Sequence, residues 1–244
     1  MIRIENLHKA FEGKPVLRGI HLEIADGETV AVLGKSGSGK TVLLKHIVGL
    51  MKPDQGHVWV DEWDVPRLRR RQLYELRRRF GYVFQASALF DSLTVYENLA
   101  LPLRDRGVPE AEIRRRVLRA LERVDLQGAE NLYPSEMSGG MQKRASVARA
   151  LVIEPEYLLY DEPTTGLDPV TADRINDLMI RLKKDLGITA VLVTHDMRSA
   201  LRVADRLVLL SEGRIRVSVP VAEVFSTPDP ELQDFLESIR PKVD

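Results

Sequence analysis

The sequence predicts an α/β fold in which a parallel sheet is covered on both faces by helices. Two observations support this class: short β-rich runs occupy the start of the chain, and strand and helix patterns alternate from residue 138 onward. A third refines it. Residues 89–151 carry apolar side chains at helical spacing, which predicts an all-helical subdomain inserted between the two halves of the sheet.

Composition and charge narrow the class of protein. The chain has 244 residues, of which 44% are hydrophobic and 30% charged, as in an ordinary globular protein. Its 36 basic residues balance 36 acidic ones, which argues against a generally basic nucleic-acid binder. Cysteine is absent, so disulfides and thiolate chemistry are excluded. No apolar run approaches the roughly 18–20 residues of a membrane span, and no signal peptide is expected.

The first part of the chain reads as strands followed by a helix. Strands are predicted at 2–7, at 19–24 and, after the turn at Asp26 and Gly27, at 29–33. A helix is predicted over 39–50, a strand over 57–60, an arginine-rich helix over 68–79 and a strand over 81–84.

The later elements follow the same signals. Helices are predicted over 94–104, 109–124 and 138–152, and over 169–186 with Pro169 in the first turn. Strands are predicted over 157–160, 190–194 and 206–210, with a helix over 197–203. In the tail, 221–225 predicts a helical turn, and Leu232, Phe235, Leu236 and Ile239 form an apolar helical face. That face is expected to pack on its own unit; packing on a second copy is the alternative.

Residues 34–41 match the phosphate-binding loop pattern in full, between an apolar strand and a helix. The glycines let successive backbone N–H groups point at phosphate oxygens, and the helix N-terminus favours an anion. Lys40 is expected to reach the β and γ phosphates, and the Thr41 hydroxyl to bind Mg²⁺. The predicted nucleotide-binding residues here are Gly34, Lys35, Ser36, Gly37, Ser38, Gly39, Lys40, Thr41 and Val42.

Three polar residues follow apolar strands at their carboxyl ends, where ligands bind in such sheets. Asp161 is expected to hold Mg²⁺, and Glu162 to polarise the attacking water as general base. The structural alternative is that this pair merely ends a strand and caps a turn. His195 is expected to contact the γ-phosphate, while the other four histidines follow no site pattern.

Ser138, Gly139 and Gly140 open a predicted helix, with Ser138 as its N-cap and accessible amides behind it. Taken with the phosphate loop, Asp161-Glu162 and His195 in this order, the segment makes residues 2–217 resemble the ATP-binding-cassette (ABC) ATPases. The resemblance implies a phosphate-loop NTPase core with an antiparallel β subdomain and an inserted α-helical subdomain. In one domain over 1–244, the core and β subdomain would cover 1–88 and 152–217, the helical subdomain 89–151, and the tail 218–244.

The same resemblance implies further roles. Phe11 resembles the aromatic that stacks on adenine, and Gln85 the glutamine that senses Mg²⁺ and contacts the permease. Asp168 resembles the residue that couples the two sites of a dimer. The alternatives are a core aromatic, a plain loop residue and the N-cap before Pro169. ATP and Mg²⁺ would bind between two copies arranged head to tail, and hydrolysis would drive separate integral membrane permease subunits.

Two departures indicate a subfamily. Met137 and Met141 replace the usual leucine and glutamine around Ser-Gly-Gly. With the segments 84–95 and 132–136, they resemble the ATPases of the Mla/Mce phospholipid transport systems, which implies a lipid-binding MCE-type component and a peripheral position on the cytoplasmic face of the inner membrane. An importer ATPase for a small polar solute such as an amino acid is the alternative. A soluble ABC-type ATPase acting on nucleic acid or ribosomes is less favoured, because such ATPases usually have long heptad coiled coils or two cassettes in tandem, and 244 residues with one phosphate loop fit neither. The arginine runs are interleaved with glutamates, which is typical of a solvated helix face.

Overall fold

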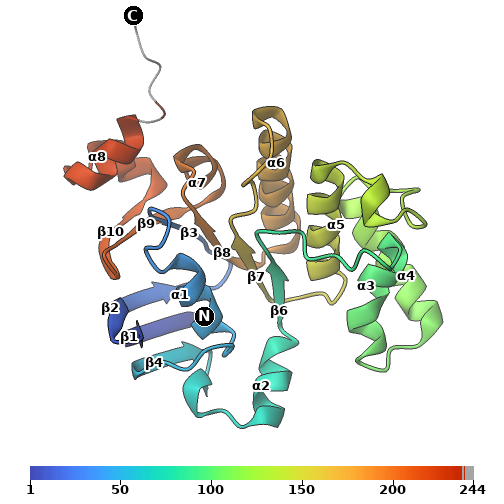
Figure 1. Cartoon of the computed structure of the whole chain (residues 1–244), viewed down its shortest axis with the longest axis horizontal. Helices are drawn as coiled ribbons and strands as arrows, with labels where there is room; N and C mark the ends of the chain where they lie inside the picture. Colours follow the sequence, from blue (N-terminus) through green and yellow to red (C-terminus); the bar gives the residue numbers. More distant parts are fainter. Residues whose placement is uncertain (238, 240–244) are drawn as a thin grey trace, which may run out of the picture. The chain divides into compact units, whose positions relative to one another are not determined.

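A computed structural model describes residues 1–237 and residue 239 (Figure 1). The chain forms two compact units. Unit 1 comprises Met1–Arg77 and Thr189–Asp244, and unit 2 comprises Arg78–Ile188. Among the described residues, no helix combines the length and the apolar character needed to cross a membrane.

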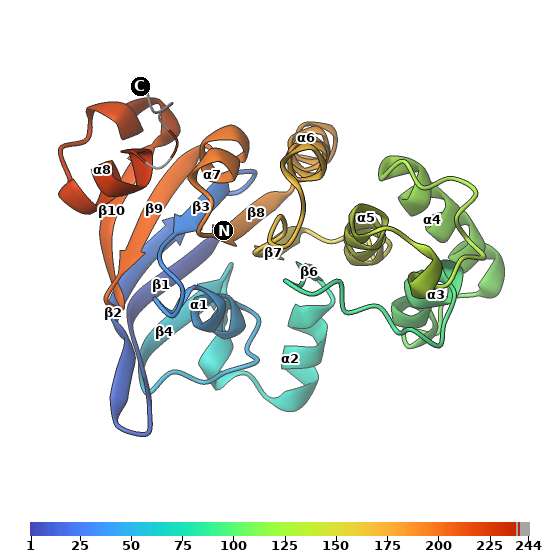
Figure 2. The ribbon, with the colours of Figure 1, turned by 45° about the horizontal axis from the view of Figure 1, so that its top comes forward.

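Unit 1 contains an antiparallel sheet with the strand order β2-β1-β4-β5 (Figure 2). The strands are β1 (Ile2–Phe11), β2 (Lys14–Ile24), β4 (Gln55–Val60) and β5 (Trp63–Asp64). The first three match the predicted strands but are longer. The hydrophobic pattern missed the added end of β1 because the strand changes register after Ile4 and none of its residues beyond Leu7 is buried. The two-residue strand β5 carries no recognisable period and was not predicted.

The second set of strands in unit 1 has the order β10-β9-β3-β8. Its members are β3 (Thr29–Leu33), β8 (Thr189–Thr194), β9 (Arg206–Ser211) and β10 (Arg214–Pro220). Strand β3 lies parallel to both β8 and β9, as predicted, and every residue of β3 and β8 is buried. Strand β10 runs antiparallel to β9 and was not predicted, because only Val217 among its residues is buried.

The helices of unit 1 are α1 (Lys40–Ile47), α2 (Arg70–Arg77), α7 (Met197–Val203) and α8 (Pro230–Glu237), with the 3₁₀ helices η1 (Val65–Arg67) and η3 (Val221–Ser226). The tail packs on its own unit, as expected: Leu232 and Leu236 are fully buried. Arg216 Nε on β10 lies 2.7 Å from an Asp229 carboxylate oxygen just before α8.

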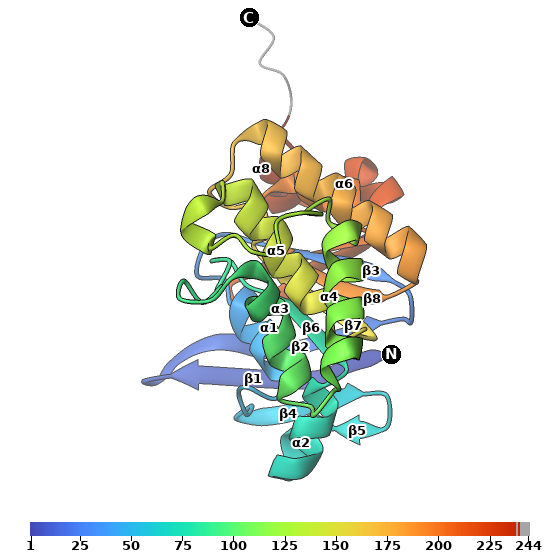
Figure 3. The same cartoon turned by 90° about the vertical axis from the view of Figure 1, so that its right-hand side faces the viewer.

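Unit 2 is mostly helical (Figure 3). Its two strands, β6 (Phe80–Val83) and β7 (Tyr157–Asp161), run parallel. The helices are α3 (Val95–Arg104), α4 (Glu110–Arg123), α5 (Gly139–Leu151) and α6 (Pro169–Leu186), with the 3₁₀ helix η2 (Pro134–Glu136). Helices α3 and α4 pack on each other and on α5, and the predicted apolar face of α4 is buried. The predicted antiparallel β subdomain is therefore present as the sheet β2-β1-β4-β5, and the predicted helical insertion as α3, α4 and α5.

Candidate nucleotide site

The phosphate-loop segment lies in unit 1 between β3 and α1. Two of its positions require glycine, one because of close packing and one because of its backbone conformation. A Cβ at Gly34 would lie 2.4 Å from the Leu210 carbonyl oxygen and 2.6 Å from Ser38 Oγ, and Gly39 has a φ of +104°. Lys35, Ser36 and Gly37 are exposed at the tip of the loop. The backbone therefore curls tightly between a buried strand and a helix whose first turn has no side-chain cap.

Two polar groups in this loop fit a phosphate ligand. The Lys40 ammonium is buried and donates to the carbonyl oxygens of Gly34 at 2.8 Å and Lys35 at 3.2 Å, which holds it beneath the loop. Ser38 Oγ is buried and has no hydrogen-bond partner in the described part of the chain. An unpaired buried hydroxyl is costly, so an anion at this loop would satisfy it.

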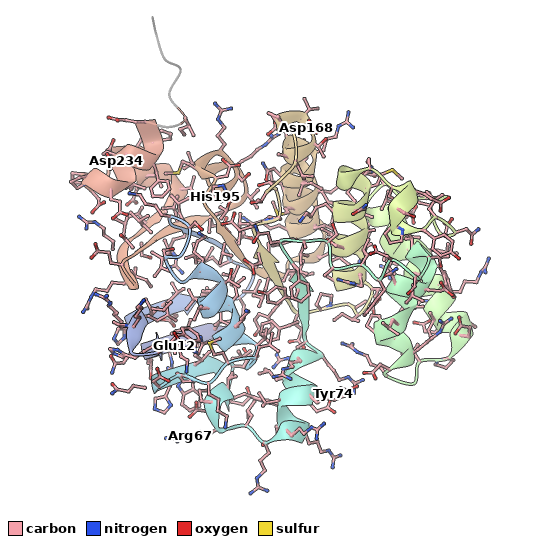
Figure 4. All side chains as sticks on the ribbon, viewed as in Figure 1. Glu12, Arg67, Tyr74, Asp168, His195 and Asp234 are labelled. Carbon is pink, nitrogen blue, oxygen red and sulfur yellow. The ribbon has the colours of Figure 1, made fainter. Side chains whose placement is uncertain are left out.

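His195 leaves the sheet beside the phosphate loop. Leu33 of β3 pairs with Thr194 of β8, so Gly34 and His195 follow directly at the same edge of unit 1. His195 is exposed although every residue of β8 before it is buried, and Figure 4 labels it beyond the end of β8. The carboxyl-end argument made from the sequence therefore placed these two segments together correctly.

The remaining candidate residues of unit 1 are Phe11, Thr41 and Val42. Phe11 ends β1 with 40% of its surface exposed, which rules out the core-aromatic alternative. The Lys9 ammonium lies 5.7 Å from the centre of the Phe11 ring. Thr41 and Val42 lie in the first turn of α1 and are partly exposed.

In unit 2, Asp161 and Glu162 stand at the end of β7, both buried, with 5% and 7% of their surfaces exposed. The Tyr82 hydroxyl donates to Asp161 Oδ2 at 3.1 Å. Burial raises the pKa of Tyr82, and the Asp161 charge and hydrogen bond raise it further, so Tyr82 stays a donor. Glu162 accepts a hydrogen bond from the Thr165 hydroxyl at 3.2 Å. Its φ of +49° is strained for a non-glycine residue, as is common at functional sites.

Gln85 is exposed in the loop after β6, and two basic side chains from α5, the buried Lys143 and the half-buried Arg149, fix the backbone around it. Lys143 donates to the carbonyl oxygens of Gln85 at 2.6 Å and Phe84 at 3.3 Å. Arg149 donates to those of Ala88 and Ser87. Burial lowers the pKa of Lys143, while the Asp161 charge opposes that change. Gln85 therefore lies in a loop whose backbone is held in place by hydrogen bonds from α5.

The N-termini of α5 and α6 meet. Ser138 caps α5, as predicted, by accepting from the Met141 N–H at 3.3 Å. Asp168 caps α6 by accepting from the Thr171 N–H at 3.0 Å, so its N-cap interpretation is confirmed; Figure 4 labels Asp168 at the start of that helix. A Cβ at Gly140 would lie 2.6 Å from Thr171 Cγ2, so only glycine fits there without a shift, whereas Gly139 is exposed.

Sequence reasoning missed Tyr82, Lys143 and Arg149. Tyr82 belongs to a strand pattern, and the two basic residues belong to a helical run, so each had an ordinary structural reading. The available signal was the presence of a lysine at a buried position of α5, since a buried cation needs partners.

Comparison with known proteins identifies the class. Residues 17–165 match the family model described as ABC transporter, so the chain belongs to this family. The fold is that of an ABC ATPase with a phosphate-loop NTPase core, and the chain is an ATP-hydrolysing, ATP-binding subunit of an ABC transporter.

Relatives and solved structures agree on the class. The chain is 41% identical over 232 residues to the methionine import ATP-binding protein MetN 1 of Bacillus cereus, covering 93% of this chain and 67% of that protein. It is 37% identical over 238 residues to the intermembrane phospholipid transport system ATP-binding protein MlaF of Haemophilus influenzae, covering 97% and 90%. A dimeric post-hydrolysis structure of the cassette MJ0796 with ADP and Pi has a TM-score of 0.83 at 34% identity, covering 91% and 99%. The structure of cbiO1 from Clostridium perfringens has a TM-score of 0.86 at 32% identity, covering 97% of this chain and 98% of that chain.

Proposed function

We propose that two copies of this chain bind and hydrolyse ATP head to tail and so drive a membrane permease whose cargo is phospholipid. The observation that supports phospholipid as the cargo is the similarity to the phospholipid transport ATPase MlaF, at 37% identity over 97% of this chain and 90% of that protein. The segments 84–95 and 132–136 and Met141, which resemble Mla/Mce-type ATPases, support the same cargo.

In this proposal the phosphate loop holds the triphosphate. The backbone amides of residues 34–42 and the unpaired Ser38 hydroxyl point at phosphate oxygens, and Lys40 neutralises the β and γ phosphates. Phe11 stacks on adenine, for which its exposure at the end of β1 is suitable. His195, beside the loop at the same sheet edge, contacts the γ-phosphate.

Three oxygen donors suit Mg²⁺: the Thr41 hydroxyl, the Gln85 side-chain carbonyl and the Asp161 carboxylate. Hard oxygen ligands of this kind are those that Mg²⁺ prefers. When bound with ATP, Mg²⁺ neutralises charge on the β and γ phosphates. Glu162 polarises the attacking water as general base, and its burial and the Thr165 hydrogen bond hold the carboxylate in place.

The second copy completes each site. Ser138, Gly139 and Gly140 present the uncrowded first turn of α5, and the adjoining start of α6 brings Asp168 to the same surface of unit 2. A helix N-terminus favours an anion, and closure around the triphosphate excludes water and strengthens each contact. The dimeric MJ0796 cassette supports this arrangement. Met141 lacks the polar contact that glutamine gives, so the backbone amides and Ser138 carry the binding.

The permease contact lies on unit 2. A hollow of about 620 Å³ there is lined by the aromatic residues Phe80, Tyr82, Phe84 and Phe90, by Leu101, and by the charged residues Asp105 and Arg149. Phe84, Phe90 and Leu101 are large apolar residues with 40%, 53% and 42% of their surfaces exposed. Such a surface is typical of a protein interface. Gln85 directly follows Phe84, so a permease segment seated there adjoins the proposed metal ligand. The chain would lie peripherally on the cytoplasmic face of the inner membrane.

Nucleic acid is not the proposed partner, since several arginines are already paired with glutamates. Glu112 accepts from Arg115 and Arg116, Glu156 pairs with Arg79, and Glu110 pairs with Arg104. The corresponding test is that added DNA leaves the ATPase rate unchanged. A marked, salt-sensitive stimulation by DNA would contradict this part of the proposal.

One specific observation favours the second candidate, import of an amino acid: the 41% identity to a methionine import ATPase. Both functions use the same ATP chemistry and differ only in the permease. Purification of the chain in complex with its membrane subunits, followed by mass spectrometry of bound molecules, separates the two candidate functions. Phospholipid bound by the complex, and ATPase stimulation by phospholipid vesicles but not by methionine, is expected. Methionine-dependent stimulation would replace the lipid proposal. The Glu162→Gln complex controls for contaminating ATPases.

A further inference from the structure

The hydroxyl of Tyr82 reaches Asp161 because of the register of β6 and β7. Tyr82 pairs with Leu159 across the two parallel strands. Side chains alternate between the faces of a strand, so Asp161, two residues beyond Leu159, lies on the face of Tyr82 and one step further along. The tyrosine ring spans that diagonal, and its Oη lies 3.1 Å from Asp161 Oδ2. A tyrosine at either neighbouring position of β6 would face the other way.

The ring itself is held in place. Tyr82 stacks on Phe84, with ring centres 4.3 Å apart and planes inclined by 26°. Stacked aromatic pairs of this spacing add stabilisation beyond simple burial. Phe84 directly precedes Gln85, and Lys143 binds the carbonyl oxygens of both residues. The hydroxyl of Tyr82 is therefore aimed by the same segment that carries Gln85.

We propose that Tyr82 is a positioning residue that orients the Asp161 carboxylate for Mg²⁺, an inference that rests on the proposed metal role of Asp161. A hydrogen bond to Oδ2 restricts rotation of the carboxylate group about its Cβ–Cγ bond. Phenylalanine would fill the same space on β6 but would leave that rotation less restricted. Partners of metal-binding carboxylates commonly set both ligand orientation and metal affinity.

The test measures metal binding directly in the full-length chain. The Glu162→Gln background prevents turnover, and Mn²⁺ titration with a non-hydrolysable ATP analogue, followed by electron paramagnetic resonance, replaces an activity assay. We expect Tyr82→Phe to weaken Mn²⁺ binding about tenfold and to leave affinity for the analogue in EDTA unchanged. The control is Tyr96→Phe, since the Tyr96 hydroxyl also donates to a carboxylate oxygen at 3.1 Å, that of Glu110 on α4. Tyr96→Phe should bind Mn²⁺ with the same affinity as the Glu162→Gln protein without it.

Asp161→Asn separates the two hypotheses. If Asp161→Asn weakens Mn²⁺ binding and Tyr82→Phe does not, Asp161 keeps its proposed metal role and the positioning role of Tyr82 is refuted. If Asp161→Asn binds Mn²⁺ normally, the metal role itself fails and the inference falls with it. Equal losses of metal-free and metal-dependent affinity in Tyr82→Phe would show a general structural defect and would also overturn the inference. Wild-type-like thermal unfolding of Tyr82→Phe, together with selective loss of Mn²⁺ binding, is the supporting result.

Discussion

Leu33 and Thr194 are directly paired across the parallel strands β3 and β8, so the chain enters the phosphate loop at Gly34 beside the point where it reaches His195. A buried strand pair thus delivers a glycine loop and an exposed histidine to one edge of unit 1. This relationship follows from parallel pairing alone and explains why the two motifs act on one ligand in the proposed mechanism.

Replacing this histidine tests that role. His195→Ala is expected to lower the ATPase turnover about 100-fold, the usual cost of removing one donor to developing charge, with little change in ATP affinity. Turnover and nucleotide binding should be measured separately. His21→Ala, which alters another exposed histidine of unit 1, provides the matched control. Equal turnover in the two variants would remove His195 from the reaction.

Lys40 should be required for binding itself. Lys40→Ala removes the buried ammonium beneath the loop, and the expected loss of ATP affinity is about tenfold to 100-fold, as for other hydrogen bonds to charged groups. Calorimetric titration with an ATP analogue measures it. Lys45→Ala on the same helix serves as the control. Unchanged affinity in Lys40→Ala would contradict the proposed cradle.

Glu162→Gln should abolish turnover while ATP still binds, because the amide keeps the shape of the carboxylate but cannot act as a base. The dimer is then expected to stay closed in ATP, visible as a doubled mass in size-exclusion chromatography with light scattering. Glu156→Gln, an exposed position that pairs with Arg79, is the control. Hydrolysis near the wild-type rate in Glu162→Gln would exclude the proposed base.

The contact between Gly140 and Thr171 predicts a stability difference between two adjacent glycines. Gly140→Ala forces a Cβ to 2.6 Å from Thr171 Cγ2 and should cost about 1–3 kcal/mol in urea unfolding. Gly139→Ala meets Leu167 only at 3.8 Å and should be neutral or stabilising by up to about 1 kcal/mol. Adding Thr171→Ser to Gly140→Ala removes the Cγ2 methyl group and should restore the stability that Gly140→Ala loses. Failure of that rescue would show that the strain arises elsewhere.

His46 should make stability depend on pH near neutrality. It is buried on α1, and burial lowers its pKa below 6.5, with Lys9 lowering it further and the Val42 carbonyl and Asp54 opposing. The unfolded chain therefore binds this proton more readily, so stability is lost as the pH falls through about 6.5, at up to about 1.4 kcal/mol per pH unit. Urea unfolding between about pH 7.5 and pH 5.5 measures the slope. His46→Leu should flatten it; an unchanged slope would assign the effect to other groups.

Sequence patterns predicted the strands that are buried along their whole length and the helices that begin at a clear capping signal. The strands β3, β7 and β8 are buried along their whole length, and the start of α6 follows from Pro169 and the Asp168 cap. Strand β10 escaped prediction because it is an edge strand with a single buried side chain. The extension of β1 escaped because a bulge interrupts its period.

The sequence by itself determined the chemistry of this protein, since the phosphate loop, Asp161-Glu162 and Ser138-Gly139-Gly140 are contiguous motifs whose residue types and order carry their meaning. Only the tertiary structure decided which side chains support them. Tyr82 reaches Asp161, Lys143 holds Gln85, and Thr171 requires glycine at position 140. The physical reason is that these contacts join residues far apart in the chain. Strand register and helix packing set their distances, and no local pattern encodes them.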